Sequence, residues 1–259
     1  MIQNYAPGPA PAYRISSVDH ALQLAMLLWQ SDTLRVSDAA EHLGVARSTA
    51  HRLLAMLVFR GFARQLEGSP LYVPGPVLSE AGSWAMARLE IQRKAVPFLR
   101  RLSESTGETA TLQMLDGREV AFVDTFESSN PIRVGSRTGL TLPAHTSAGG
   151  KVLLSQLNED EIVRLYPEET PLEQIAPSPA VATRETLIRE LREIRRNGRA
   201  IDIRSSVVAA GVPVLGRGGR AVAALAVAAP RSRVGKETVR ALVSELHIIS
   251  ADFEVALSA

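Results

Sequence analysis

The sequence contains no cysteine. This absence excludes disulfide bonds, metal sites built on thiolates and a cysteine nucleophile. The chain also lacks an apolar run of the roughly 18 residues that a membrane-spanning helix needs. Its proline-rich start has no apolar core of the kind that a signal peptide carries, and residues 1–16 are expected to form a disordered arm. We therefore expect a cytoplasmic protein with no membrane partner.

Net charge is also small. The chain has 29 basic and 27 acidic residues, which leaves a formal charge of +2 and argues against a protein that coats nucleic acid nonspecifically. Its 259 residues, 46% of them hydrophobic, are enough to bury a substantial core in one large domain or two medium ones.

Residues 37–73 have the pattern of a winged helix-turn-helix. Apolar residues at helical spacing predict a short first helix, with Ser37 as its candidate cap and Gly44 as the tight turn that ends it. The following helix has an apolar side that includes Ala50 and Leu54. Two β-prone runs separated by turn residues complete the motif as a hairpin, the wing.

The polar side of that second helix predicts a DNA-binding surface. On spacing alone, DNA binding and a plain helical hairpin are about equally favoured. Residues 45–66 contain four arginines and no acidic residue, and this local excess of positive charge favours DNA. Residues 1–80 as a whole hold six arginines and six acidic residues, so affinity should depend on dimerisation and well-placed contacts. The expected DNA contacts are Ser37, Arg47, Ser48, Thr49, His51, Arg52 and Arg64.

Two further helices are expected beside this motif. Residues 17–30 predict a helix that packs behind the other two through a face formed by Val18, Leu22, Ala25, Met26 and Trp29. Residues 77–92 predict a helix at a domain boundary, whose apolar stripe either packs on its own domain or pairs with a second copy. The residues of that stripe that we assign to dimerisation are Leu78, Ala81, Trp84 and Leu89.

The rest of the chain predicts a second domain in which helices pack on a mainly antiparallel sheet. A hairpin is expected around Asp116 and Gly117. The expected strands cover residues 108–115, 119–126, 132–134, 200–203, 207–215 and 221–229, and the expected helices cover residues 97–106, 147–156, 159–166, 184–197 and 236–257.

Five segments, taken together, make the chain resemble the IclR family of bacterial transcriptional regulators from Ser17 onward. They are SVDHALQLAMLL, SDAAEHLGVARSTAHRLLAML, STGETATLQMLDGREVAFVD, LPAHTSAGGKVLLSQL and VPVLGRGGRAVAALAVAAP, in the family's order and approximate spacing.

The resemblance implies an α+β chain with a winged helix-turn-helix over residues 17–75, a dimerising linker helix over 76–92 and a GAF-like domain over 93–259. It also implies a homodimer or homotetramer that binds operator DNA, acts as a repressor or activator, and responds to a small-molecule effector, usually an organic or aromatic acid. We expect a repressor.

In that family the effector pocket corresponds to His145 and the small residues after it, the segment after Gly198, and the last strands of the sheet. The small residues also support a ligand site without the resemblance, because they let a carboxylate approach the backbone amides at the start of a helix. A tight turn packed on the sheet is the alternative. The expected effector contacts are His145, Ser147, Ala148, Gly149, Gly150, Asp202, Val207, Ala209, Ala226 and Ala228.

This chain departs from the family pattern at two places. The segment between Gly198 and Pro213 is about three residues shorter, and its acidic run is reduced to Asp202. Alanines at 209, 226 and 228 replace the polar side chains that many members direct into the pocket. We therefore expect a pocket with few polar side chains, whose effector is an aromatic or medium-chain acid or is held mainly by backbone groups. The alternative is a regulator that has lost effector sensing.

Motifs of catalysis are absent. The five histidines include no pair at metal-ligand spacing, no G-x-S-x-G nucleophile turn occurs, and a lysine preceding a valine rules out a phosphate-binding loop at 146–152. The sequence therefore predicts no catalytic residue, no metal site and no cofactor. The alternative interpretation is an enzyme of small-molecule metabolism with an accessory winged helix.

Overall fold

The structure, a computed structural model, describes residues 12–167, 172 and 183–258. The arm expected over residues 1–16 lies outside the described residues as far as residue 11. The chain divides into two compact units, residues 1–88 and 89–259. No helix within the described ranges is both long enough and apolar enough to cross a membrane.

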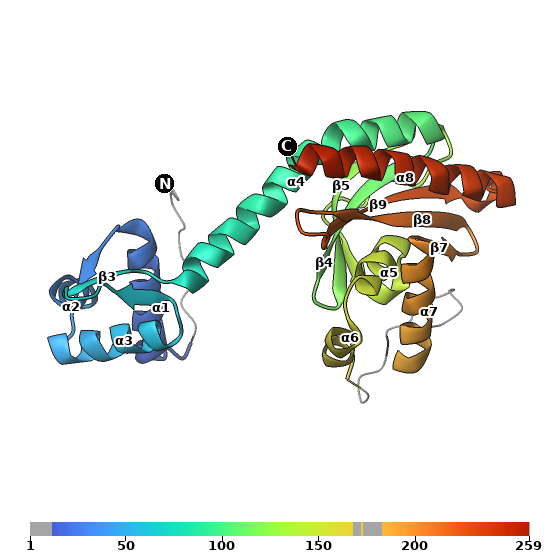
Figure 1. The fold of residues 1–259 in the computed structure, drawn as a ribbon. Coiled ribbons are helices and arrows are strands. Elements are labelled where there is room, and N and C mark those ends of the chain that lie inside the picture. Colours follow the sequence, from blue (N-terminus) through green and yellow to red (C-terminus); the bar gives the residue numbers. More distant parts are fainter. Residues whose placement is uncertain (1–11, 168–171, 173–182, 259) are drawn as a thin grey trace. The chain divides into compact units, whose positions relative to one another are not determined.

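The first unit is a winged helix-turn-helix (Figure 1). Glycine allows the turn between the second and third helices, since Gly44 has a φ of 64°, a left-handed conformation that costs other residues more. The three strands form an antiparallel sheet in the order β1-β3-β2. The elements are α1 (Ser16–Gln30), β1 (Leu34–Arg35), α2 (Val36–Leu43), α3 (Arg47–Phe59), β2 (Ala63–Gln65) and β3 (Leu71–Pro74).

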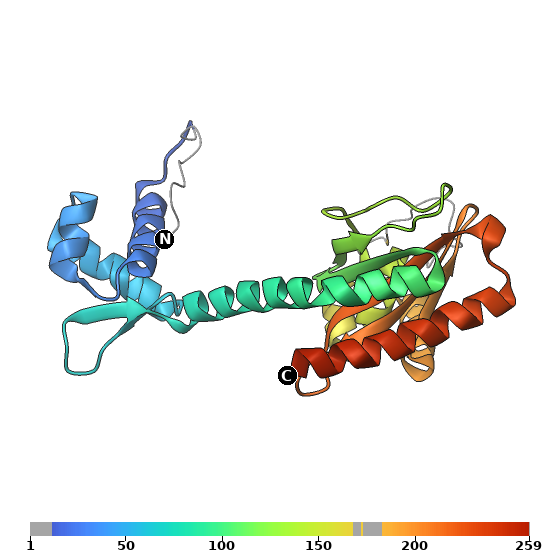
Figure 2. The same cartoon turned by 90° about the horizontal axis from the view of Figure 1, so that it is seen from above.

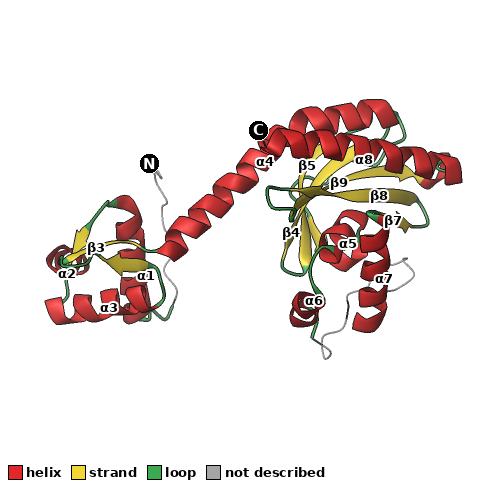
Figure 3. Cartoon of the chain, viewed as in Figure 1, coloured by secondary structure: helices red, strands yellow, loops and turns green. Residues whose placement is uncertain are grey.

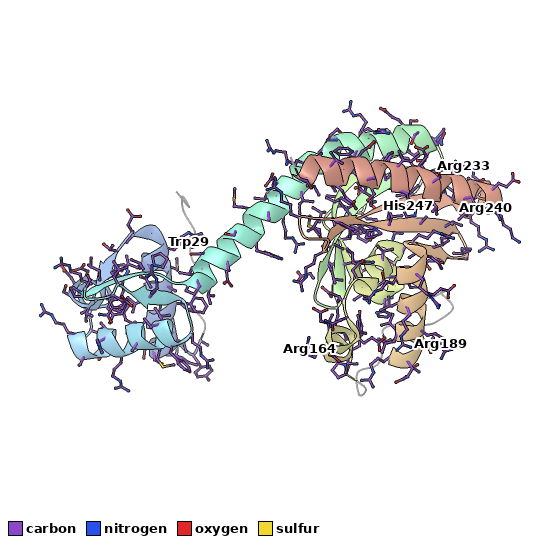
Figure 4. The ribbon with its side chains drawn as sticks, viewed as in Figure 1. Trp29, Arg164, Arg189, Arg233, Arg240 and His247 are labelled. Carbon is purple, nitrogen blue, oxygen red and sulfur yellow. The ribbon has the colours of Figure 1, made fainter. Side chains whose placement is uncertain are left out.

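Helix α1 turns a different side to the core than its sequence indicates. The buried residues are Leu24 and Leu28, whereas Leu22 and Trp29 of the predicted face are 61% and 65% exposed (Figure 4). Leu24 to Trp29 is a nearly continuous apolar run, so helical spacing alone does not select one side. Of the predicted face only Ala25 packs against this core, and the prediction is wrong for Val18, Leu22, Met26 and Trp29.

The start of α2 also differs from expectation. The helix begins at Val36, and Ser37 lies inside its first turn, where its hydroxyl donates a 2.9 Å hydrogen bond to Asp38 Oδ1. The carboxylate of Asp38 accepts a 3.4 Å bond from the amide of Arg35 and takes over the capping that we assigned to Ser37.

Helix α4 runs without interruption over Pro76–Thr106, where the sequence indicates two helices that meet near Pro97. Proline removes only one backbone hydrogen bond from a helix, and here its ring is exposed. On the other side of α4, Ala95, Leu99 and Leu102 are buried in the core of the second unit. The apolar area that they bury outweighs the lost bond.

The second unit is a six-stranded antiparallel sheet covered by helices, which confirms the predicted α+β class. Its strand order is β6-β5-β4-β9-β8-β7. Helix α8 and the second half of α4 cover one face, and α5, α6 and α7 lie on the other (Figures 1 and 2). The elements are β4 (Thr109–Asp116), β5 (Glu119–Phe126), β6 (Thr141–Pro143), α5 (Ala148–Ser155), α6 (Glu159–Leu165), α7 (Arg184–Asn197), β7 (Ala200–Ile203), β8 (Val207–Leu215), β9 (Ala221–Pro230) and α8 (Lys236–Ser258).

Strand β9 divides its side chains between the two faces. Leu225 and Val227 belong to the core under α4 and α8, where the rings of Phe98 and Phe253 are 4.9 Å apart. The alternating residues Ala224, Ala226 and Ala228 therefore point to the opposite face of the sheet. That face carries a second core and a cavity.

One predicted strand does not form. Residues 132–134 lie in a loop between β5 and β6. There the carbonyl of Val134 accepts a 2.6 Å bond from the Thr109 hydroxyl, and the side chain of Arg133 pairs with Glu127. The loop is held by side chains instead of a neighbouring strand. The short strands β1 and β6 were not expected, because two or three residues show no periodicity. Figure 3 shows the helices, strands and loops that form.

Candidate DNA-binding surface and effector pocket

Helix α3 separates a buried side from an exposed polar side. Ala50 and Leu54 are fully buried and Leu57 is 8% exposed, which fixes the inward face. At about 100° per residue, the opposite face must point outward. The five residues of α3 that we expect to contact DNA are all exposed: Arg47, Ser48, Thr49, His51 and Arg52. Ser37 on α2 is half-buried, and Arg64 is exposed on β2 of the wing.

The arginines of this region keep their charge unpaired. None of the four between residues 45 and 66 makes an ion pair with any residue that the structure describes. Arg60 instead stacks on the ring of Phe59, 5.1 Å from its centroid. Positive side chains without internal partners can approach phosphates without first breaking an ion pair.

The stripe of α4 that we assign to dimerisation is largely exposed, and it runs from the first unit to Leu89 at the start of the second. Trp84 and Leu89 are 57% and 61% exposed, Ala81 is exposed and Leu78 is half-buried. The guanidinium of Arg88 lies 4.4 Å from the centroid of the Trp84 ring.

The second unit contains a cavity of about 230 Å³ on the face of the sheet that carries α5. Alternate residues of β4, β9 and β8 form its floor, and the first residues of α5 and two loops form its walls. The lining residues are Thr109, Thr111, Gln113, Phe122, Val134, Gly135, Arg137, Ser147, Ala148, Asp202, Arg204, Ser205, Ser206, Val207, Ala209, Ala226, Val227 and Ala228.

Seven of the ten residues that we expect to contact an effector line this cavity. They are Ser147, Ala148, Asp202, Val207, Ala209, Ala226 and Ala228. The other three, His145, Gly149 and Gly150, are buried but do not line it.

Close packing explains why residues 149 and 150 are glycines. A Cβ atom at Gly149 would lie 2.4 Å from Gln113 Oε1, and one at Gly150 would lie 2.2 Å from the carbonyl oxygen of Ala144. The amide of Gly150 already donates to Ser147 Oγ at 3.0 Å. Gly149 thus lets α5 approach the sheet, and Gly150 lets it approach the turn at Ala144; the amide of Gly150 is not available to a ligand.

His145 packs against an aromatic ring. It lies edge to face with Tyr166, with ring centroids 5.9 Å apart. Burial raises the pKa of Tyr166 to about 12, against the opposing effect of the Arg118 guanidinium. Neither His145 nor Tyr166 lines the cavity. Within the described ranges, no group of three or more His, Asp or Glu side chains could hold a metal ion.

Polar residues of β4 were missed by the sequence analysis. Thr109, Thr111 and Gln113 point into the cavity in register beside the alanines of β9, with Thr111 opposite Ala226. Gln113 donates a 2.9 Å bond to Thr111 Oγ1, and Ser147 Oγ lies 3.5 Å from Gln113 Oε1. The expectation of few polar side chains is therefore wrong. The alternation of polar residues at 109, 111 and 113 was the signal that could have found them.

A second polar group follows β7. Arg204 donates a 2.7 Å bond to Asp202 Oδ2 and another to the carbonyl oxygen of Thr146. These bonds tie the end of β7 to the turn that precedes α5. Arg204 therefore lines the cavity with its charge balanced by that of Asp202.

Comparison with known proteins assigns both units. Residues 17–67 match the description "IclR helix-turn-helix domain", and residues 84–254 match "Bacterial transcriptional regulator IclR C-terminal". The chain is 34% identical over 224 residues to the HTH-type transcriptional regulator XynR of Escherichia coli K12, covering 85% of this chain and 88% of that protein. It is 29% identical over 205 residues to the HTH-type transcriptional repressor AllR of the same strain, covering 78% and 75%.

Solved structures agree. A putative IclR transcriptional regulator from Silicibacter sp. TM1040 superposes with a TM-score of 0.62 at 28% identity, covering 93% of this chain and 96% of that chain. An IclR homologue from Microbacterium hydrocarbonoxydans, solved with 4-hydroxybenzoate, has the same fold with a TM-score of 0.58 at 22% identity, over 94% and 98%. The chain therefore belongs to the IclR family of bacterial transcriptional regulators, with a helix-turn-helix domain in its first unit and the family's C-terminal domain as its second.

Proposed function

We propose that this chain represses transcription by binding a palindromic operator as a dimer or tetramer, and that a small organic acid bound in the cavity changes that binding. The observation that carries the proposal is the exposed arginine-bearing side of α3, opposite a fully buried stripe, in a chain whose other unit encloses a cavity. The name of the relative AllR, a repressor, supports this sign of regulation. Such a protein acts in the cytoplasm, where bacterial DNA lies.

In this proposal, α3 lies in the major groove and the wing contacts the backbone. Arg47 and Arg52 come from successive turns of the exposed side, and an arginine that forms two hydrogen bonds with guanine supplies about 1 to 3 kcal/mol of discrimination. Ser48, Thr49 and His51 lie beside them, and Ser37 and Arg64 reach phosphates from α2 and β2. We expect loss of Arg47 to relax sequence preference and loss of Arg64 to weaken binding to all sequences alike.

A gel-shift titration on the DNA upstream of the chain's own gene tests this assignment. Arg47→Ala and Arg52→Ala should each weaken operator binding about 5- to 150-fold if they contact bases. Arg220→Ala is the matched control, because Arg220 is an exposed arginine in the second unit. Unchanged affinity and footprint in both α3 variants would refute the proposed role of α3.

Assembly through α4 completes the proposal. A palindromic operator needs two copies of the winged helix at a fixed spacing, and an exposed apolar helix stripe is suited to pair across a twofold axis. The assigned stripe contains Leu78, Ala81, Trp84 and Leu89, of which Trp84 offers the largest apolar area.

The relatives' names support regulation over catalysis, since they are transcriptional regulators. We propose that any acid bound in the cavity leaves chemically unchanged. Incubation of the purified protein with a bound acid, followed by mass spectrometry of the acid, tests this; turnover without any effect on operator binding would favour the enzyme alternative.

A further inference from the structure

The cavity floor has polar edges and an apolar centre. Across the sheet, Thr109 of β4 pairs with Ala228 of β9, which pairs with Ala209 of β8, which in turn pairs with Asp202 of β7. All four residues line the cavity. A ligand lying across this row therefore meets a hydroxyl, then two methyl groups, then a carboxylate.

The charges of the lining do not cancel. Two arginines and one aspartate line the cavity, which gives +2 − 1 = +1. Arg204 is the arginine whose charge is balanced, because it is bonded to Asp202 at 2.7 Å. The charge without a counterpart belongs to Arg137. Among the residues that the structure describes, Arg137 makes no ion pair, and its guanidinium faces the ring of Phe122 at 5.7 Å.

The loop that carries Arg137 is fixed in place. Glu127 accepts a 2.7 Å bond from Arg133 and a 3.0 Å bond from the amide of Ser136. Val134 is bonded to Thr109 on the cavity floor, and the amide of Gly139 donates to the carbonyl of Phe122 at 2.9 Å. Arg137 is thus positioned before any ligand arrives, which reduces the entropy lost on binding.

We infer that Arg137 is the residue that binds the carboxylate of the effector, and that the effector is a monoanionic acid with a hydroxyl or keto group at its other end. This inference rests on the proposed function and adds the ligand's class and the residue that selects it. The carboxylate pairs with Arg137 at the loop, the body of the ligand lies on Ala209, Ala226 and Ala228, and its second polar group reaches Thr111 or Gln113.

The geometry also sets what the cavity rejects. A neutral amide of the same shape forfeits the charge-assisted bond to Arg137. A dicarboxylate brings its second charge to Thr111 and Gln113, where it meets no cation, because Arg204 is already held by Asp202. A plain hydrocarbon acid leaves Thr111 and Gln113 without a new partner. An acid with one carboxylate and one hydroxyl forms the charge-assisted bond to Arg137, carries no second charge and offers Thr111 and Gln113 a new partner.

Isothermal calorimetry on the full chain tests the inference with two ligand sets. One contains 4-hydroxybenzoate, 4-hydroxybenzamide and terephthalate, and the other contains 6-hydroxyhexanoate, 6-hydroxyhexanamide and adipate. At least one hydroxy acid should bind at least 10-fold more tightly than its amide and its dicarboxylate. Arg137→Gln should raise the dissociation constant of that acid about 10- to 100-fold and leave the amide unaffected, because a charge-assisted bond is lost.

Arg189→Gln is the control, since it removes the same charge from an exposed position on α7 outside the cavity (Figure 4). Its affinities should equal those of the wild type. The inference falls if acid and amide bind equally, if Arg137→Gln keeps the acid preference, or if neither hydroxy acid binds at 10 mM.

Gel shifts separate this result from the proposed function. An acid that binds through Arg137 without changing operator binding supports the inference and refutes effector control. A neutral compound that releases the operator supports effector control and refutes the inference.

Discussion

The two glycines at the start of α5 make a sharp prediction about replacement by alanine. In an exposed helix, Gly→Ala stabilises by about 0.5 to 1 kcal/mol. At Gly149 the new methyl group would lie 2.4 Å from Gln113 Oε1 and 2.7 Å from Gln113 Cδ, so the glutamine must move. At Gly150 it would lie 2.2 Å from the carbonyl oxygen and 2.7 Å from the Cα of Ala144, so backbone must move.

The loss of unfolding free energy in each variant depends on how easily the neighbouring atoms can move. Moving Gln113 breaks its bonds with Thr111 and Ser147 and leaves a buried amide poorly paired, at about 1 to 3 kcal/mol, which the helix gain partly offsets. We expect Gly149→Ala to lose about 1 to 2 kcal/mol of unfolding free energy, and with it the binding of any ligand that contacts Gln113. Gly150→Ala should lose about 3 kcal/mol or more of unfolding free energy, because backbone cannot move aside as easily as a side chain can.

Urea unfolding of the full chain, followed by circular dichroism, measures these differences. Gly82→Ala in α4 is the control, since its Cβ would meet nothing within 4 Å and Gly82 is exposed in a helix. The expected order of stability is Gly82→Ala above the wild type, then Gly149→Ala, then Gly150→Ala. If both α5 variants are as stable as the wild type or more so, the close approaches described here do not exist.

Four further outcomes are expected. Trp84→Glu should weaken dimers and operator binding together, and a wild-type monomer at micromolar concentration in sedimentation would contradict assembly through α4. Ala226→Leu should fill the cavity, so that the variant still binds operator in gel shifts but no longer responds to the effector; a retained response would place the ligand elsewhere. Hydrogen bonds from Arg133 and Ser136 lower the pKa of Glu127 below 4.5, so the contribution of Glu127 to stability is present above pH 4.5 and is lost as pH falls through its folded pKa; Glu127→Gln should remove this part of the acid sensitivity in hydrogen exchange of the 127–140 loop. The raised pKa of Tyr166, about 12, means that the unfolded chain releases this proton first, so stability should fall between about pH 10 and 12, and Tyr166→Phe should remove that slope in pH-dependent unfolding.

The sequence predicted elements well where a periodic run stands between clear stops. The helix over 184–197 and the strands over 200–203 and 207–215 have the predicted bounds in the structure. Thr183 and Gly198 flank that helix as cap and left-handed stop, which are local signals. The predicted break in the helix at Pro97 was wrong, because the packing that keeps α4 continuous there involves residues distant in sequence, which local signals do not report.

The sequence predicted only part of the cavity lining, for a physical reason. The alanines on its floor and the start of α5 were identified through the family resemblance. Thr111 lies 115 residues from Ala226 and Gln113 lies 34 residues from Ser147, while Arg137 belongs to a loop between two strands. Only the register of β4 with β9 and the anchoring of the 127–140 loop bring these three residues to the site. Periodicity reports which face a residue is on, and it does not report what that face opposes.

The alternation along β9 has a consequence for protein engineering. Ala226 and Ala228 line the cavity, whereas the side chains of Leu225 and Val227, one step away on the same strand, belong to the core under α4 and α8. Under the proposed effector control, substitutions at 226 and 228 should therefore change which acid is detected while the residues that keep the sheet folded stay untouched. A library restricted to those two positions and to 209 is a compact starting point for biosensors that report new acids through an unaltered promoter.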